Sequence, residues 1–454
     1  MREVIILAAG EGLKFWPYQS TRNKCMFPIA NKPLLAHTVE TCIEAGIEHI
    51  VIVSKTHTDP IRSYFKQFKQ VEIVELTQTK GSAESFVFGM EKIKGNDVCV
   101  LFGDCLIQKE DLIPYLQNSS VYTALISPLR EHPTNWIACQ LEKDHIKLFG
   151  AHQRGSDMTH QMAGFTCDRD FLFTAEHNPN RFTQLKVGVG SPFESFIEES
   201  LNEIIKEGTI LKYSITSEPF FDCDKPWHAL EANAYMAQKM CQTLTKNQFD
   251  EGSLIEDTAR IEGFVKLGKN SRIGHNVWVR GNLIVGDNTM IENGVILEGD
   301  TIIGDECTLY NHCKVHSHSV IGNRNKFDQG FEFLSGVTLD HVYCVHYGEY
   351  YGLIGENTDL GAGTTSGTLR FDDQLSAHYV RGRKEFPTNY ANASYLGDYC
   401  RTGVSALLMP GVKVGAYSVV GSGVVLQRDV KDHTLIYVKQ ELVEESWGVD
   451  KYGW

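Results

Sequence analysis

The sequence predicts a two-domain fold, with a Rossmann-like α/β domain followed by a parallel β-helix, and two observations support that prediction. In roughly the first half, continuous apolar runs alternate with helical patterns, whereas after about Leu254 a large apolar residue returns at every sixth position. At 454 residues the chain is too long for one ordinary core. We expect the α/β domain over 1–247, the β-helix over 248–432 and a C-terminal tail over 433–454.

The first half contains the strands and helices of a mostly parallel sheet. Three runs have the continuous apolar character of strands that are buried on both faces: Val4–Ala8, His49–Val53 and Val98–Phe102. Helical spacing of apolar residues marks three further segments: Leu34–Ala45, Ser82–Met90 and Pro226–Met240. Strands that alternate with helices in this way predict a sheet covered on both faces.

The six-residue period begins at Ile255 and is carried by large apolar residues in every repeat: Ile255, Ile261, Leu267, Ile273, Val279, Val285, Ile291, Leu297, Ile303, Leu309, Val315, Ile321, Phe327, Phe333, Leu339 and Val345. The phase then slips, resumes at Ile354 and Leu360, and returns over Leu396–Leu426. Each repeat would form one flat side of a triangular prism, with its apolar residue pointing inward. Over about 170 residues the pattern resembles the left-handed β-helix of hexapeptide-repeat proteins.

The segment 367–394 breaks this repeat and carries four basic residues: Arg370, Arg381, Arg383 and Lys384. It is either a passive insertion or a loop that leaves the rigid coils to serve an active site. Because long loops on rigid scaffolds often carry function, we favour the active-site loop.

Composition excludes several function classes. The net charge of −14, without a basic stretch, argues against nucleic-acid binding. The 12 cysteines lack a CxxC pair, which indicates reduced thiols rather than a disulfide framework or a zinc site. Met1 leads directly into a strand and no apolar run approaches transmembrane length, so we expect a cytoplasmic protein without a signal peptide or a membrane partner.

A glycine-rich turn follows the first strand, in the segment Leu7-Ala8-Ala9-Gly10-Glu11-Gly12-Leu13-Lys14. Such a turn exposes backbone N–H groups that can bind phosphate oxygens, and glycine permits a close approach. The alternative is a simple turn with solvated lysines. The basic and proline residues that follow, through Arg22, Lys24, Pro28 and Lys32-Pro33, favour the phosphate site.

These residues resemble the motif of sugar-1-phosphate nucleotidyltransferases, LAAG-x-G-x-R-x-x-P followed by K-x-x-x-P-I-x-x-K-P. With the β-helix, nearly the whole chain resembles the bifunctional nucleotidyltransferase/acetyltransferase family, of the archaeal-like type that makes UDP-N-acetylglucosamine or dTDP-glucose. The later segment Gly361–Asp373 is similar to that family's GAGT-x-T-x-N-L-R-F-D-D. The resemblance implies a Rossmann-like nucleotidyltransferase domain that acts on a nucleoside triphosphate and a sugar 1-phosphate.

The resemblance also implies roles for single residues. Leu7, Ala8, Ala9, Gly10 and Gly12 would bind the nucleotide, together with the base-reading segment that holds Gln78, Gly81 and Ser82. Lys14 and Lys24 would be catalytic, by neutralising charge on the reacting phosphates. Lys14 stands where the family has arginine, so it keeps the charge but loses the planar guanidinium.

Two aspartates are candidate ligands for Mg²⁺. Asp104 follows the apolar strand that ends in Phe102-Gly103, and Asp222 lies in a segment similar to the family's W-x-D-…-P-W-x-L-L-x-A-N. Carboxylates at the carboxyl ends of strands hold Mg²⁺ in such sheets, although a single one is often only a helix cap. Two at family positions favour the metal.

The sugar pocket departs from the family pattern. The spacing from Gln78 to Gly81-Ser82 is shorter than the family's, so this segment does not predict which nucleotide base is bound. Ala151-His152 replaces a Glu-Lys pair, and Met162 precedes Ala163-Gly164 where the family has Asn-Ala-Gly. Gly164, Arg383 and Lys384 remain as sugar-binding candidates. Lost hydrogen-bonding side chains imply either an unusual sugar or a degenerate site.

The resemblance implies a second site in the β-helix, between subunits of a homotrimer, with acetyl-CoA as co-substrate and His346 as general base. The alternative for His346 is a polar histidine at a coil edge. His312, His316 and His318 flank the inward positions and are expected on exposed faces, not as metal ligands.

We therefore predict a Mg²⁺-dependent sugar-1-phosphate nucleotidyltransferase that releases pyrophosphate, with acetyltransferase activity in the β-helix as the second expectation. Two alternatives stay open. One is a catalytically weak protein that binds nucleotide sugars and serves regulation or assembly, which the Lys14, Ala151 and Met162 departures favour. The other is an enzyme with acyl transfer alone.

Overall fold

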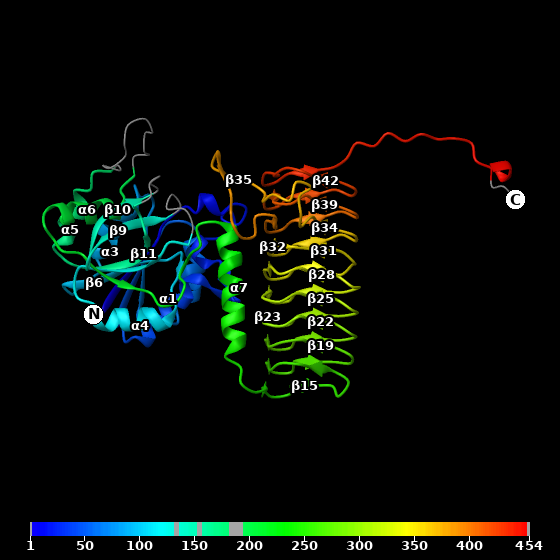
Figure 1. The fold of residues 1–454 in the computed structure, drawn as a ribbon, viewed down its shortest axis with the longest axis horizontal. Coiled ribbons are helices and arrows are strands. Elements are labelled where there is room, and N and C mark those ends of the chain that lie inside the picture. The colour runs from blue at the N-terminus through cyan, green and yellow to red at the C-terminus, as the bar shows by residue number, and fades with distance from the viewer. Residues whose placement is uncertain (1, 131–135, 152–156, 181–193, 452–454) are drawn as a thin grey trace.

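The computed structural model describes residues 2–130, 136–151, 157–180 and 194–451. An α/β domain and a prism of stacked coils lie side by side, and helix α7 (Pro226–Gln242) runs along the prism between them (Figure 1). The C-terminal segment leaves the last coil and extends away from both bodies. No helix in the described ranges is long and apolar enough to cross a membrane.

The α/β domain is built on a nine-stranded sheet with the order β5-β4-β1-β6-β11-β8-β12-β10-β9. Its first four strands are parallel, and β11 runs antiparallel to β6. The strands are β1 (Glu3–Ala8), β4 (His49–Ser54), β5 (Val71–Glu75), β6 (Asp97–Phe102), β8 (Thr123–Pro128), β9 (Ile137–Glu142), β10 (His145–Ala151), β11 (His160–Asp168) and β12 (Lys212–Ile215). The parallel half of the sheet carries the strands that the apolar runs predicted.

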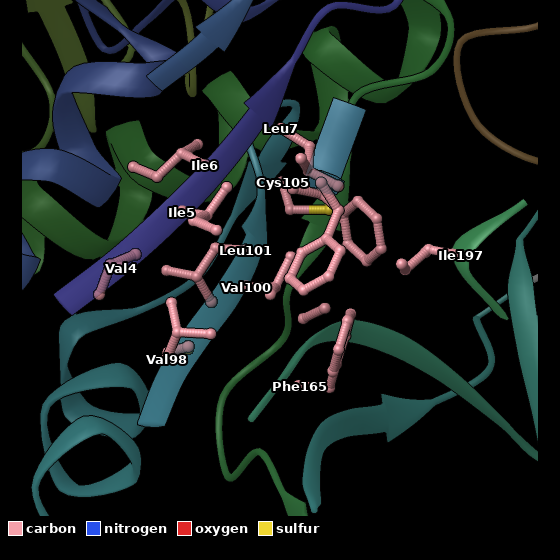
Figure 2. Packing of buried hydrophobic residues seen from close by; sticks show 14 of the residues in the cluster. Val4, Ile5, Ile6, Leu7, Val98, Val100, Leu101, Cys105, Phe165 and Ile197 are labelled. Carbon is pink, nitrogen blue, oxygen red and sulfur yellow. The ribbon is translucent and has the colours of Figure 1, made fainter. Parts of the chain in front are cut away.

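Helices cover the sheet because their apolar faces pack on the buried strands. They are α1 (Leu34–Glu44), α2 (Thr58–Phe65), α3 (Ser82–Met90), α4 (Lys109–Asn118), α5 (Phe171–Glu176) and α6 (Ile197–Lys206). Side chains of β1 and β6 form the centre of one apolar cluster, which Phe165 of β11 and Ile197 of α6 extend (Figure 2). Because both faces of β1 and β6 are buried, only their carboxyl ends are free to carry polar chemistry.

Two short ribbons lie beside this sheet. β2 (Pro28–Ile29) pairs with β3 (Lys32–Pro33), and β7 (Cys105–Leu106) pairs with β13 (Phe221–Asp222). Both pairs are antiparallel. The second ribbon connects the end of β6 with the start of α7.

The second half forms a left-handed parallel β-helix with three faces, each a ladder of very short parallel strands. One face lies against α7, and we call it the α7 face: β14 (Gln248–Phe249), β17 (Val265–Leu267), β20 (Leu283–Val285), β23 (Thr301–Ile303), β26 (Val320–Ile321), β29 (Val337–Thr338), β32 (Gly352–Ile354), β37 (Ser394–Leu396) and β40 (Lys413–Val414). This arrangement and the α/β sheet confirm the predicted fold class.

The other two faces complete the prism. The second face is β15 (Leu254–Ile255), β18 (Arg272–Ile273), β21 (Met290–Ile291), β24 (Thr308–Leu309), β27 (Lys326–Phe327), β30 (Tyr343–Cys344), β33 (Asp359–Leu360), β38 (Arg401–Thr402), β41 (Val419–Val420) and β43 (Leu435–Ile436). The third face is β16 (Arg260–Ile261), β19 (Trp278–Val279), β22 (Ile296–Leu297), β25 (Lys314–Val315), β28 (Glu332–Phe333), β31 (Glu349–Tyr350), β34 (Thr365–Ser366), β39 (Leu407–Leu408) and β42 (Val425–Leu426). A hairpin of β35 (His378–Val380) and β36 (Arg383–Glu385) leaves the coils between β34 and β37.

The six-residue phase slips earlier than the sequence predicted. Ile303 pairs with Ile321, 18 residues later, but Ile321 pairs with Thr338, only 17 residues later. The turn between β28 and β29 has three residues, where the turn between β25 and β26 has four. The prediction that Leu339 and Val345 point inward is therefore wrong.

Thr338 and Cys344 occupy those inward positions instead, and both are buried. Leu339 is buried for a different reason, because it belongs to an apolar cluster shared by the two domains. That cluster joins Tyr18 and Trp227 of the α/β domain to Leu353 and Tyr395 of the β-helix. The two domains therefore share a continuous apolar interface.

Candidate active site

The turn after β1 has the backbone that the glycine pattern predicted. Gly12 has a φ of +63°, and a Cβ there would lie 3.2 Å from the Lys24 Cβ, so this position favours glycine. A Cβ on Gly10 would meet no atom within 4 Å, so Gly10 faces open space. Leu7, Ala8 and Ala9 are buried, which leaves their backbone as the part that could contact a ligand.

Lys24 stands beside this turn in a short 3-10 helix, Lys24–Met26, and Asn23 holds it there. The Asn23 amide donates to the Ala8 carbonyl at 3.2 Å and to the Thr56 carbonyl at 3.0 Å. Its oxygen accepts from the Cys25 N–H at 2.9 Å. Asn23 therefore ties the lysine to the phosphate turn and to the chain that follows β4. Asn23 was not among the site residues predicted from the sequence.

Asp104 and Asp222 meet at the end of β6. The Gly103 N–H donates to the Leu7 carbonyl at 2.9 Å, which keeps the chain against the end of β1. In the β7–β13 ribbon Asp222 pairs with Cys105, and the Cys223 N–H donates to the Asp104 carbonyl at 2.9 Å. Two aspartates that are 118 residues apart in sequence thus become neighbours.

The donor set fits a divalent cation. Ligand atoms of Asp104, Cys105 and Asp222 all lie within 4.8 Å of one another. The buried Asp222 Oδ1 has no hydrogen-bond partner in the described part of the chain. Mg²⁺ prefers carboxylate oxygen to thiol sulfur, so Asp104 and Asp222 are the suitable donors. Two carboxylates with open positions match the way proteins bind Mg²⁺.

Lysines surround a third carboxylate, Asp224. Its Oδ2 lies 3.0 Å from the Lys14 Nζ and 3.7 Å from the Lys225 Nζ, and its Oδ1 lies 3.5 Å from the Lys24 Nζ. The Lys24 Nζ also lies 2.6 Å from Asp104 Oδ2. The predicted pair Lys14 and Lys24 therefore converges with the predicted pair Asp104 and Asp222. Asp224 and Lys225 were not among the residues predicted from the sequence, although both directly follow Asp222-Cys223.

The charges of this cluster shift its ionisation. Burial alone would lower the pKa of Lys24, but Asp104 and Asp224 raise it well above its ordinary value. Burial, followed by the negative charges of Asp104 and Asp224, raises the pKa of Asp222 well above its ordinary value. Burial also acts to raise the pKa of Asp224, but Lys14, Lys24 and Lys225 outweigh it and lower that pKa well below its usual range. Strong perturbation by specific partners is typical of functional sites.

The predicted base-reading residues lie at the start of α3. Gln78 is exposed. A Cβ on Gly81 would lie 2.5 Å from the Ser195 carbonyl oxygen, and Ser82 Oγ accepts from the Ile197 N–H at 2.9 Å. Gly81 and Ser82 therefore hold the start of α6, and Gln78 alone of the three points its side chain to solvent.

The predicted sugar residues do not gather in one place. A Cβ on Gly164 would lie 2.6 Å from the Val100 carbonyl, so this glycine lets β11 pack on β6. Met162 is buried on the same strand, and Ala151 pairs with Ile137 at the end of β10. His152 lies outside the described residues.

Arg383 and Lys384 lie on the β35–β36 hairpin, and both are exposed. The hairpin is anchored on the α/β domain, because Glu385 Oε2 lies 3.0 Å from the Lys225 Nζ. The His378 ring packs on the Trp227 ring with 4.9 Å between centroids. The insertion that breaks the repeat therefore reaches the start of α7, next to the lysine cluster.

His346 is exposed in the turn between β30 and β31, where the second face meets the third. This corner is opposite the α7 face. Among the residues that the structure describes, none is a hydrogen-bond partner of its imidazole. His346 is thus remote from the α/β domain and from Arg383 and Lys384.

The three histidines near residue 315 lie on the outside of the prism, as expected. His312 is exposed, and His316 and His318 are partly exposed. His316 is enclosed by carboxylates, with Nδ1 3.2 Å from Glu298 Oε2 and Nε2 2.7 Å from Glu332 Oε1. Lys314 pairs with the same two glutamates at 3.3 and 3.0 Å, so these residues form an ion-pair ladder.

Arg22, inside the phosphate-binding motif, has an interdomain role. Its Nη2 lies 2.5 Å from Asp398 Oδ2 and 3.3 Å from Glu356 Oε2, both in the β-helix. Thr21 donates to the same Asp398 oxygen. The motif therefore holds the two domains together as well as shaping the phosphate turn.

The chain is similar to known proteins over both of its domains. A family model described as Nucleotidyl transferase matches residues 3–131, and models of bacterial transferase hexapeptide repeats and of the hexapeptide repeat of succinyl-transferase match 282–317 and 264–298 with 396–428. "Bifunctional protein GlmU" of Methanococcus vannielii is 27% identical over 453 residues, covering 97% of this chain and 99% of that protein. A "Bifunctional sugar-1-phosphate nucleotidylyltransferase/acetyltransferase" of Sulfurisphaera tokodaii is 25% identical over 437 residues, covering 94% and 98%.

A Methanococcus maripaludis protein, also named "Bifunctional protein GlmU", is 30% identical over 450 residues. The alignment covers 97% of this chain and 98% of that protein, so the similarity runs through both domains rather than through a shared fold alone. The chain therefore belongs to the family of bifunctional sugar-1-phosphate nucleotidyltransferase/acetyltransferases.

Proposed function

We propose that the α/β domain transfers a nucleotidyl group from a nucleoside triphosphate to a sugar 1-phosphate and releases pyrophosphate. The observation that carries the proposal is the convergence of Lys14 and Lys24 with Asp104 and Asp222 beside the turn after β1. Cations and a carboxylate pair next to a glycine turn suit a reaction between two phosphate groups.

In this reaction an oxygen of the sugar 1-phosphate forms a bond to the α-phosphorus. The bond from that phosphorus to the oxygen bridging it to the β-phosphate breaks, and pyrophosphate leaves. The backbone N–H groups of the glycine-rich turn Gly10–Leu13, where Gly10 borders open space, would bind phosphate oxygens. Lys24, held by Asn23, stabilises the negative charge that develops on the phosphates, and Lys14 supplies a second, more exposed positive charge.

Asp104 and Asp222 would hold Mg²⁺, which lowers the repulsion between two anionic substrates when it is bound. Asp222 fits this role because its buried Oδ1 lacks any other partner among the described residues. Cys105 supports the geometry by pairing with Asp222 in the ribbon.

We propose further that the β-helix transfers an acetyl group from acetyl-CoA, with His346 as general base, in a cytoplasmic homotrimer. Family membership and the exposed position of His346, at the corner opposite the α7 face, support this role. A neutral imidazole can accept the proton of an attacking amine.

The first test is a panel of nucleoside triphosphates and sugar 1-phosphates, with pyrophosphate release measured in the presence of Mg²⁺. Release with one pair of substrates is the expected result and identifies both. A silent panel together with thermal stabilisation by nucleotide sugars would contradict the transferase and favour the regulatory alternative. The same preparation, analysed by light scattering, should have the mass of three chains, and a monodisperse monomer would contradict the trimer.

A further inference from the structure

Asp224 occupies the centre of the lysine cluster that the proposed reaction needs for its phosphates. Three ammonium groups, from Lys14, Lys24 and Lys225, lie within 3.7 Å of its two oxygens. Two of these lysines are the ones assigned to the phosphates. A phosphate group presents negatively charged oxygens to lysines in the same way that this carboxylate does.

We infer that Asp224 is an internal anion that holds the phosphate-binding lysines in the free protein and that the phosphates of the substrate must displace it. This inference rests on the proposed nucleotidyl transfer, and it adds a residue that sets the affinity of the site for its anionic ligands.

The geometry argues against two simpler roles for Asp224. A structural ion pair would require a single lysine beside Asp224, but three are present. One of them, Lys225, has a side chain that is only 1% exposed and already pairs with Glu385 at 3.0 Å. A metal ligand would be expected beside Asp104 and Asp222, but Asp224 is outside the group of ligand atoms that lie within 4.8 Å of one another. Both Asp224 oxygens instead face lysines.

The site is also open enough for an exchange of anions. The Lys14 side chain is 34% exposed and that of Asp224 is 15% exposed, so a ligand can approach from the side of Lys14. Lys24 is buried and has Asp104 as a second partner at 2.6 Å, so it stays in place when Asp224 leaves. Displacement therefore breaks one short contact, between Lys14 and Asp224 at 3.0 Å, and two longer ones, to Lys24 at 3.5 Å and to Lys225 at 3.7 Å.

Removing the charge of Asp224 should have two opposite effects. The free protein becomes less stable, because three lysines lose their common partner. Anion binding becomes tighter, because the ligand no longer competes with a bound carboxylate. A residue with a purely structural role would produce the first effect without the second.

The test uses inorganic pyrophosphate as the probe, with EDTA present so that no divalent cation contributes. Its affinity for the full-length protein is measured by calorimetry for wild type, Asp224→Asn and Asp224→Ser. The matched control is Glu75→Gln, which also removes one carboxylate from an ion pair, with Arg62 at 2.7 Å, but on the surface. Melting temperatures are recorded with and without pyrophosphate.

We expect both Asp224 variants to bind pyrophosphate about tenfold more tightly than wild type, with a lower melting temperature when free and a larger rise on binding. Glu75→Gln should behave as wild type. Equal or weaker binding by both Asp224 variants would overturn this inference and leave the proposed function standing. Failure of wild type and both Asp224 variants to bind pyrophosphate would also overturn this inference, whereas the proposed function is tested separately by pyrophosphate release in the presence of Mg²⁺.

Discussion

The end of the α/β sheet and the corner of the β-helix at His346 are organised in different ways. At the sheet, the turn after β1, the end of β6 and the β7–β13 ribbon bring residues from three distant segments to one place. At the corner, consecutive coils present side chains separately, and His346 is exposed without a hydrogen-bond partner among the described residues. The open parallel sheet thus assembles a site within one chain, whereas the corner of the prism presents His346 on an exposed surface.

The largest expected effect separates the two sites. Lys24→Met should lower pyrophosphate release by about 10²–10³-fold, because it removes a positive charge from the reacting phosphates. It should leave acetyl transfer unchanged. His346→Ala should do the reverse, with a loss of acetyl transfer of about 10²-fold or more. Both activities are measured on each variant, and a parallel loss of both in either variant would contradict the division into independent sites.

The link between the two regions depends on Arg22. The Asp398 side chain is fully buried, so Arg22→Ala leaves a buried carboxylate without its cation and should cost about 4 kcal/mol of stability. The matched control is Arg2→Ala, whose pair with Glu48 at 3.3 Å is exposed and should contribute less than about 1 kcal/mol. Chemical denaturation gives both values. Equal losses of stability in Arg22→Ala and Arg2→Ala would show that the buried Asp398 carboxylate does not need its pairing with Arg22.

Glu198 makes the stability of the α/β domain depend on pH. Burial, followed by the charges of Glu199 and Glu194, raises the pKa of Glu198 from 4.5 to about 8. Between these values the folded protein holds a proton that the unfolded chain has lost, so this contribution is present below about pH 4.5 and is lost as the pH rises through 8.

Relative to wild type, Glu198→Gln should therefore gain about 3.5 kcal/mol of stability between pH 5 and pH 8. Glu203→Gln, on the same helix and paired with Lys206 at the surface, should not change the pH profile. Melting temperatures across pH 5–8 measure both variants. Parallel profiles for wild type and Glu198→Gln would mean that Glu198 titrates normally.

The smallest effect concerns the hairpin that the β-helix extends to the α/β domain. Glu385→Gln weakens the contact with Lys225 and should raise amide hydrogen exchange in His378–Glu385, with a cost of about 1 kcal/mol. Asp372→Asn removes an exposed pair with Arg370 in the same insertion and serves as the control. If exchange in the hairpin is the same in both variants, the anchor is elsewhere, for example in the packing of His378 on Trp227.

The sequence predicted the elements well where one local rule determines them. Periodicity identified α1, α3 and α7 almost to the residue, because each buries one apolar face. It failed at β29, where a shortened turn shifts the phase by one residue. Because Leu339 is apolar, the six-residue pattern continues through it in the sequence. In the structure, however, Leu339 packs in the cluster between the two domains and not in the prism interior.

The candidate site was predicted in part. Lys14, Lys24, Asp104 and Asp222 follow recognisable motifs, and the structure places them together. Asp224 was missed because a carboxylate between candidate phosphate ligands matches no motif, and only the fold shows what it contacts. The position of Arg383 and Lys384 could likewise not be predicted from the sequence, because the sequence of an insertion does not indicate which surface its hairpin will contact.

The central claim is that the carboxylates at the end of β6 and in the β7–β13 ribbon support nucleotidyl transfer. Asp104→Asn tests it against Asp97→Asn, an exposed aspartate at the opposite end of the same strand. The assay uses the nucleoside triphosphate and sugar 1-phosphate that the substrate panel identifies. The rate of pyrophosphate release by Asp104→Asn should be at least about 10²-fold below that of wild type at all Mg²⁺ concentrations, and Asp97→Asn should retain the wild-type rate. Full activity of Asp104→Asn would contradict the account of this site.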